Sequence, residues 1–172
     1  MGRPRNYFAY GSNINLDQMA HRCPDAKVVG KVTLNNYELT FRGRSDGSGV
    51  ANIEPKIGAS VSGLLWQITD RCEKSLDIYE GVPRLYAQKS VTVRDEDGKK
   101  HRAMAYIMTE LYRDVALPSR YYYQGILEGY RQNGIDDKPL LDALVRCREQ
   151  VASKIVPHKP LANKKKRKQH ER

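Results

Sequence analysis

The alternation of apolar and polar residues along the chain predicts several β-strands. Strands are expected over 27–34 and 37–42, joined by a turn at Asn35 and Asn36, and a further strand over 61–68 places Trp66 on one face. A β-hairpin is expected where residues 90–94 and 101–108 flank the turn sequence DEDG at 95–98. The strands therefore precede most of the helical part of the chain.

Helical spacing of apolar residues appears in three places. Residues 119–133 and 140–154 are expected to be helices, with Gly134 and Pro139 marking the break between them. A shorter helix is expected around Cys72, Leu76 and Tyr79, which are spaced as one apolar face. Strands and helices in this order indicate the α+β fold class, and periodicity alone indicates no more than that.

The segment YFAYGSN at residues 7–13 runs from a short aromatic strand directly into a tight turn. Gly11 can adopt positive φ and lets a ligand approach the main chain, and Ser12 and Asn13 add a hydroxyl and an amide. Asn15 is a good N-cap for a following helix, so backbone N–H groups and a helix N-terminus point toward one place. This arrangement favours an anion or oxyanion site, although the same four residues YGSN also form ordinary turns.

Glu80 stands at the predicted end of the helix that contains Leu76. Gly81 is suited to the left-handed position after the helix, and Pro83 prevents its continuation. A carboxylate is electrostatically unfavourable there, because a helix C-terminus carries partial negative charge. That position, together with burial beside Tyr79, raises the pKa of a carboxyl toward the range of a general base. The alternative is a solvated glutamate with no chemical role.

Several motifs recur in series between Tyr7 and about Ile135. They are YFAYGSN at 7–13, GVANI at 49–53, VSGLLW at 61–66, LD at 76–77 leading to EGV at 80–82, the strand from Tyr86, AYIMT at 105–109, PS at 118–119 and NG at 133–134. In order and spacing this set resembles the γ-glutamylcyclotransferase family. The resemblance implies a single domain with a small mixed β-barrel flanked by helices, in which the YGSN loop and Glu80 meet at one mouth.

The resemblance also implies an activity and a set of site residues. The expected reaction is the cyclisation of a γ-glutamyl amide to 5-oxoproline with release of the amine, without a metal ion or other cofactor. Glu80 matches the catalytic glutamate and is expected to act as both general acid and general base. The expected substrate-binding residues are Tyr10, Gly11, Ser12, Asn13 and Tyr122. Tyr121 and Tyr123 remain alternatives to Tyr122, because three adjacent tyrosines allow the alignment to slip by one residue.

The identity of the γ-glutamyl substrate is left open by the sequence. Arg84 follows Glu80 closely and faces either a substrate carboxylate or water. The Gly- and Ser-rich segment 42–49 is either a mobile loop at the mouth of the site or a plain connection. A γ-glutamyl amino acid, a γ-glutamyl amine, a glutathione-like peptide and a γ-glutamylated antibiotic precursor all remain candidates.

Length and cysteine usage fit a single cytoplasmic domain. The 172 residues, 40% of them hydrophobic, suffice for one core, assigned to residues 1–157. No stretch reads as a signal peptide or a membrane span. Cys23, Cys72 and Cys147 are odd in number and lack metal-ligand spacing, so reduced thiols are expected. Cys72 can also be considered as a nucleophile, with buried packing the simpler alternative.

The last fifteen residues, 158–172, are strongly basic. Seven Lys or Arg against one acidic residue contribute six of the ten net positive charges of the chain. A segment of this composition is expected to be disordered and suited to electrostatic binding of nucleic acid, anionic lipid or an acidic partner, or else to be a solvated terminus without a partner. The second function class is therefore a noncatalytic binding protein on the same fold that uses this tail. The oligomeric state is not predicted.

Overall fold

The structure is a computed structural model that describes residues 2–155. Its strands are β1 (Arg5–Ala9), β2 (Lys27–Gly43), β3 (Gly49–Ile68), β4 (Tyr86–Asp95) and β5 (Lys100–Met108). Its helices are the 3-10 turn η1 (Ser12–Ile14), α1 (Leu16–Arg22), α2 (Asp70–Tyr79), α3 (Arg120–Gln132) and α4 (Lys138–Ile155).

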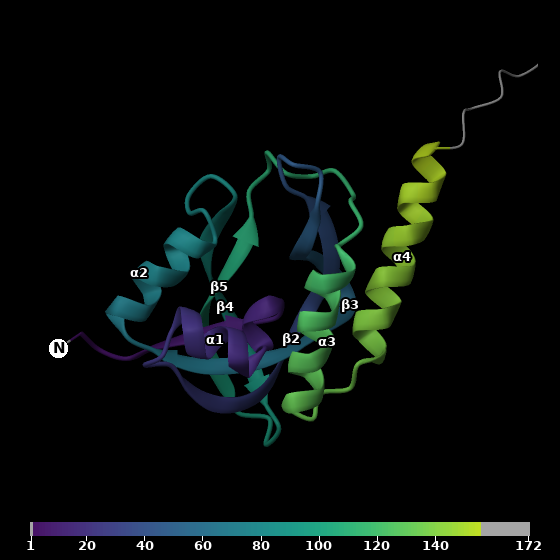
Figure 1. Ribbon diagram of the computed structural model, residues 1–172. Helices are drawn as coiled ribbons and strands as arrows, with labels where there is room; N and C mark the ends of the chain where they lie inside the picture. The colour runs from purple at the N-terminus through teal and green to yellow at the C-terminus, as the bar shows by residue number, and fades with distance from the viewer. Residues whose placement is uncertain (1, 156–172) are drawn as a thin grey trace, which may run out of the picture.

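The five strands form a closed barrel in the order β1-β3-β2-β4-β5 (Figure 1). All neighbouring strands are antiparallel except β1 and β5, which close the barrel in parallel through Tyr7 and Met104. The barrel interior and the helix contacts supply the core, with Phe8, Leu65 and Val93 among the side chains that have no exposed surface. The mixed barrel flanked by helices confirms the expected fold.

Two strands are longer than the sequence pattern indicates. The strands expected over 27–34 and 37–42 are one continuous strand, β2, and in place of the Asn35-Asn36 turn there is a shift in its register with β3. Asn36 has a φ of 63°, a conformation that Asn tolerates better than most residues, and here it accompanies the register shift without reversing the chain. The predicted strand over 61–68 is likewise the second half of the 20-residue β3.

The hairpin and the two late helices agree with the sequence. β4 and β5 pair across the DEDG turn, and α3 begins at the N-cap Ser119, whose hydroxyl accepts a hydrogen bond from the Tyr122 N–H. Gly134 follows α3 with a φ of 63°, as a helix-ending glycine does. Helix α3 packs against η1, and α4 packs along β2 on the outside of the barrel (Figure 1).

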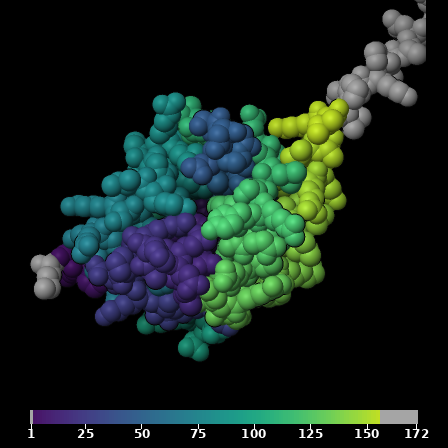
Figure 2. Space-filling model, in the orientation of Figure 1, coloured from purple at the N-terminus to yellow at the C-terminus, as the bar shows by residue number. Residues whose placement is uncertain are grey.

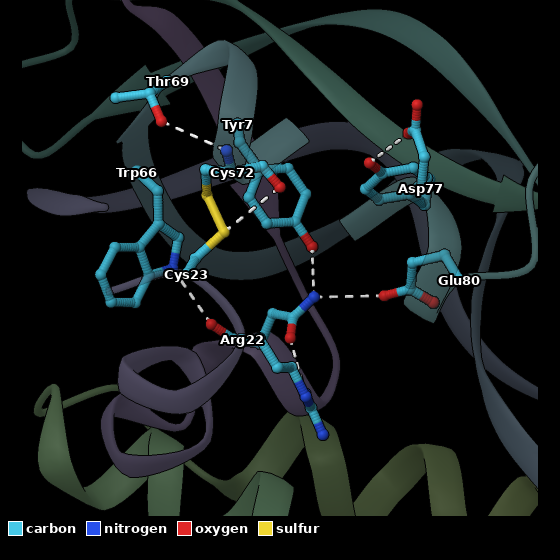
Figure 3. Close-up of a disulfide and its surroundings, with 10 residues drawn as sticks. Tyr7, Arg22, Cys23, Trp66, Thr69, Cys72, Asp77 and Glu80 are labelled. Carbon is cyan, nitrogen blue, oxygen red and sulfur yellow. Dashed lines mark hydrogen bonds between the residues drawn. A yellow bond between two sulfur atoms is a disulfide. The ribbon is translucent and has the colours of Figure 1, made fainter. Parts of the chain in front are cut away.

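Cys23 and Cys72 form a disulfide, so the expectation that all cysteines are reduced is wrong for these two residues (Figure 3). Cys23 caps the end of α1 and Cys72 lies in the first turn of α2, with their Cα atoms 5.1 Å apart. The sequence separation of 49 residues carries no pairing signal, because only the barrel topology brings the two helices together. The disulfide also removes Cys72 as a candidate nucleophile, whereas Cys147 is a free, buried thiol.

The basic segment 158–172 and the domain boundary at residue 157 lie outside the described residues and stay predictions. Within residues 2–155, none of the helices is both long enough and apolar enough to cross a membrane.

Candidate active site

All six predicted site residues line one cavity at an end of the barrel. Its volume is about 120 Å³, which suits a small polar molecule. The loop after β1, the end of α2 and the start of α3 contribute its walls, and these segments meet with the blue turn between β2 and β3 on the face shown in Figure 2. The six residues are Tyr10, Gly11, Ser12, Asn13, Glu80 and Tyr122.

The turn after β1, which lines this cavity, contains backbone N–H groups that are free. Within the described part of the chain, the N–H groups of Gly11, Ser12 and Asn13 have no hydrogen-bond acceptor, as expected at the start of a helical turn. Gly11 has a φ of −114°, so the expected positive φ is wrong. Gly11 is instead suited to this position because there is little room for a side chain. A Cβ there would lie 3.2 Å from the Ala51 Cβ and 3.6 Å from the Tyr122 hydroxyl.

Two contacts that were not predicted hold this loop in place. The indole N–H of the buried Trp66 donates a 3.0 Å hydrogen bond to the Asn13 carbonyl. On the opposite side, α3 approaches so closely that a Cβ on Gly129 would lie 2.7 Å from the Asn15 nitrogen. Asn15 caps α1 as expected, accepting a hydrogen bond from the Gln18 N–H. The donors of the loop are therefore fixed by the barrel on one side and by a helix on the other.

Glu80 is held at the end of α2 by a regular helix-ending motif. Gly81 has a φ of 63°, its N–H donates to the Ile78 carbonyl, and the Val82 N–H donates to the Asp77 carbonyl. This pair of bonds is the Schellman arrangement, which closes the helix and directs the next residues away. Glu80 is the C-cap, as the sequence predicts, and its side chain turns into the cavity.

The Glu80 carboxyl has an unusual environment for an acid. Its Oε1 accepts a 3.1 Å hydrogen bond from the Asn13 side-chain N–H, while burial around it raises its pKa from 4.5 to about 7. The positive charges of Arg22 and Arg44 and the hydrogen bond from Asn13 oppose that rise without cancelling it. Glu80 can therefore take up and release a proton near neutral pH.

Besides Tyr79 on α2, five tyrosines line the cavity, and three of these five were not predicted as site residues. Burial raises the pKa of each phenol above its ordinary value, so all five remain neutral hydrogen-bonding groups. They are Tyr7 on β1, Tyr10 after it, Tyr86 on β4, Tyr106 on β5 and Tyr122 on α3. The signal for the missed three is their place on strands that surround one end of the barrel.

The five phenols differ in whether their protons are already used. Tyr10 and Tyr86 donate to the main-chain carbonyls of Tyr106 and Ala51, and Tyr106 donates to the Asp77 carboxylate. In contrast, Tyr7 accepts from the Asn13 amide, and Tyr122 accepts from the Ala51 N–H, 2.9 Å in both cases. The hydroxyl protons of Tyr7 and Tyr122 have no acceptor within residues 2–155 and are available to a ligand.

The three adjacent tyrosines at the start of α3 differ in exposure and in whether they line the cavity. Tyr121 is 87% exposed and faces away from the cavity, and Tyr123 packs partly against the core without lining it. Tyr122 is the member of the three that reaches the site.

Two arginines near the mouth behave differently. Arg44, in the turn between β2 and β3, lines the cavity, so the segment 42–49 does form part of the mouth. No ion pair among the described residues uses Arg44, and Asp46 in the same turn is bound by Ser48. Arg84 is exposed and is not among the cavity residues, which supports the solvent alternative for it.

Comparison with known proteins gives a consistent result. Residues 7–125 match the family model described as gamma-glutamyl cyclotransferase, AIG2-like. The chain is 33% identical over 137 residues to the gamma-glutamylcyclotransferase of Homo sapiens, covering 75% of this chain and 71% of that protein, and 33% identical over 136 residues to that of Bos taurus, with the same coverage. A solved structure named gamma-glutamyl cyclotransferase aligns with a TM-score of 0.72 and 29% identity over 94% of this chain and 93% of that one.

Proposed function

The chain belongs to the gamma-glutamyl cyclotransferase, AIG2-like family and is an enzyme of the γ-glutamylcyclotransferase type, and from this we propose that it cyclises a γ-glutamyl amide to 5-oxoproline with Glu80 as the proton carrier. In this reaction the α-amine of the glutamyl group attacks its own γ-carbonyl carbon. A C–N bond forms in the five-membered ring, and the bond to the departing amine breaks.

The observation that carries the proposal is the position of Glu80. Its carboxyl, with a pKa of about 7, shares a cavity with the free main-chain donors of the loop after β1. As a carboxylate it accepts the proton that the α-ammonium group must lose before attack. As a carboxylic acid it then gives a proton to the leaving nitrogen. The second proton that the ring nitrogen must lose passes by the same carboxylate to the released amine, which leaves as an ammonium ion, so the protonation state of the enzyme is unchanged after one turnover.

The loop N–H groups supply the second requirement. When the γ-carbonyl carbon becomes tetrahedral, its oxygen takes on negative charge, and the unused donors of Gly11, Ser12 and Asn13 are suited to stabilise it. The free hydroxyl protons of Tyr7 and Tyr122 are suited to hold the α-carboxylate of the same glutamyl group. Because nucleophile and electrophile belong to one molecule, holding that molecule in a ring-like conformation is a large part of catalysis.

Arg44 supports a choice among γ-glutamyl substrates. Its side chain lines the cavity from the turn between β2 and β3, and no ion pair of the described residues engages it. We place the departing group of the substrate on this side of the cavity. A carboxylate on the leaving amine would pair with it, as in a γ-glutamyl amino acid. A γ-glutamyl amine lacks that carboxylate and leaves Arg44 without a partner.

The first experiment follows 5-oxoproline formation from a panel of γ-glutamyl amino acids and amines by wild type and by Glu80→Gln. The variant is expected to lower kcat/KM by about 10²- to 10⁴-fold, since general acid–base catalysis is worth that much. Glu149→Gln, an exposed position on α4, is the matched control and is expected to behave as wild type. Equal rates for Glu80→Gln and wild type would refute the assignment of Glu80.

A second experiment tests the preference for a leaving-group carboxylate. γ-Glutamylalanine and γ-glutamylethylamine differ only by that group, so Arg44→Ala is expected to lower kcat/KM about ten-fold for the first and to leave the second unchanged. An equal loss on both compounds would contradict a pairing between Arg44 and the leaving group.

A further inference from the structure

Arg22 is the most highly connected charged side chain next to the site, although it does not line the cavity. It is the last residue of α1, and its guanidinium donates to the Ser12 hydroxyl at 3.0 Å, the Asn13 Oδ1 at 2.6 Å and the Gln18 Oε1 at 2.7 Å. The guanidinium carbon also lies 3.8 Å from the centre of the Tyr79 ring. These contacts fix the side chain in one orientation on the outer side of the loop.

The bond to Asn13 decides which way the Asn13 amide points. A guanidinium has only donors, so the atom that faces Arg22 has to be the amide oxygen. The amide nitrogen is thereby turned to the other side, where it donates to the Tyr7 hydroxyl at 2.9 Å and to Glu80 Oε1 at 3.1 Å. With the amide reversed, its oxygen would face the Glu80 carboxylate, and two acceptors would repel each other.

The main chain at Arg22 is anchored as well. The next residue, Cys23, is bonded to Cys72 in the first turn of α2, the same helix that ends in Glu80 (Figure 3). Figure 3 shows Arg22 and Glu80 on two sides of one hydrogen-bonded chain, with the disulfide joining the elements that carry them. The separation between Arg22 and Glu80 is therefore set by covalent and hydrogen-bonded links together.

We propose that Arg22 is a positioning residue for the reaction, which orients the Asn13 amide and through it holds the Glu80 carboxylate in the cavity without touching the substrate. This inference rests on the proposed function for its kinetic consequences, but its effect on Glu80 itself is independent of the substrate. Arg22 also stabilises the ionised form of Glu80, because only the Asn13 side chain separates its positive charge from the carboxylate.

Other charged and titratable groups also lie near Glu80. Arg44, from the turn between β2 and β3, is the second cation whose charge lowers the pKa of Glu80, and it is unchanged by substitution of Arg22. The remaining titratable groups at the cavity are tyrosine phenols. Five of them have raised pKa values and stay neutral, namely Tyr7, Tyr10, Tyr86, Tyr106 and Tyr122. Tyr79 lines the cavity from α2. Asp77, also on α2, is bound by Tyr106 and Gln88.

The test compares Arg22→Gln and Arg22→Lys with wild type. Gln removes the charge and can present either an acceptor or a donor to Asn13, whereas Lys keeps the charge but loses the planar set of donors. In Arg22→Gln the acid limb of the pH profile of kcat/KM is expected to move upward by about one pH unit, with kcat lowered about ten-fold and KM little changed. Arg22→Lys is expected to restore the position of the acid limb while kcat stays low.

A matched control and a double variant separate positioning from folding. Gln18→Ala removes one Arg22 partner that is not part of the hydrogen-bonded chain to Glu80, and its pH profile is expected to equal that of wild type. In an Asn13→Ala background, Arg22→Lys is expected to cause no further loss of kcat, because the link through which it acts is already gone. A full additive loss in the double variant would overturn the proposal.

A readout without substrate keeps the inference separate from the proposed function. Carboxyl ¹³C NMR titration of Glu80, assigned by its disappearance in Glu80→Gln, is expected to give a midpoint about one pH unit higher in Arg22→Gln than in wild type. An unchanged midpoint in a folded variant would overturn the inference even if the enzyme turns over its substrate. A raised midpoint with no turnover of any γ-glutamyl compound would support the inference while the proposed function fails.

Discussion

Replacing Glu80 with Gln is expected to stabilise the folded protein above neutral pH while it removes activity. The pKa of Glu80 is about 7 in the folded state, against 4.5 for the unperturbed carboxyl. Between these two values the folded chain still holds a proton that the unfolded chain has released. The free energy of unfolding therefore falls as the pH rises through this window, and the loss is complete above pH 7.

The size of the effect follows from the two pKa values. Each pH unit between them is worth about 1.4 kcal/mol, so ionised Glu80 costs the fold about 3 kcal/mol at pH 8. Gln cannot ionise, so the variant avoids that cost. At pH 4 both side chains are neutral, and the two proteins are expected to differ only by pH-independent effects.

Urea denaturation of both proteins at pH 4 and pH 8 gives the measurement. The gain in unfolding free energy of Glu80→Gln over wild type is expected to be about 3 kcal/mol larger at pH 8 than at pH 4. Groups that titrate identically in both proteins cancel in this difference, and the exposed Glu149→Gln is expected to show none. A difference that does not change with pH would refute a buried, proton-retaining Glu80.

Three further substitutions test other parts of the site and fold. Tyr122→Phe removes the acceptor of the Ala51 N–H and a free hydroxyl donor, and is expected to lower kcat/KM about ten-fold or more in the 5-oxoproline assay; a change below two-fold would exclude a substrate contact. Gly11→Ala places a methyl group 3.2 Å from the Ala51 Cβ and 3.6 Å from the Tyr122 hydroxyl, and is expected to raise KM more than it lowers kcat. Cys23→Ser combined with Cys72→Ser is expected to lower the unfolding free energy by about 2–4 kcal/mol, and a reducing agent should then destabilise wild type but not the double variant.

The parts of the site that the sequence predicts are those specified by neighbouring residues. Glu80 followed by Gly81 encodes a helix end within two positions, and the structure has the helix end there. The YGSN loop is similarly local, because a strand, a turn and the N-cap Asn15 follow one another without interruption. The meeting of the loop and Glu80 in one cavity could be expected only from the family resemblance, because nothing in the spacing of 67 residues between Asn13 and Glu80 indicates a contact.

The parts that the sequence did not predict depend on barrel closure. Trp66 and Tyr106 belong to strands that are remote in sequence, so their contacts with the loop after β1 and with α2 exist only once the strands are ordered around the barrel. The same is true of the disulfide between the ends of α1 and α2. At Asn35 and Asn36 the sequence predicts a turn between two strands, whereas the structure accommodates the positive φ of Asn36 within one continuous strand, at a shift of its register with β3.

The place of Trp66 offers a practical advantage. It is the sole tryptophan in the chain, and its buried indole is bonded to the carbonyl of Asn13 behind the loop. Fluorescence that is excited at wavelengths absorbed by tryptophan and not by tyrosine therefore arises from one side chain, Trp66, behind the loop that lines the cavity. Emission changes on mixing with a ligand would report occupancy of this loop directly, with no label and no turnover.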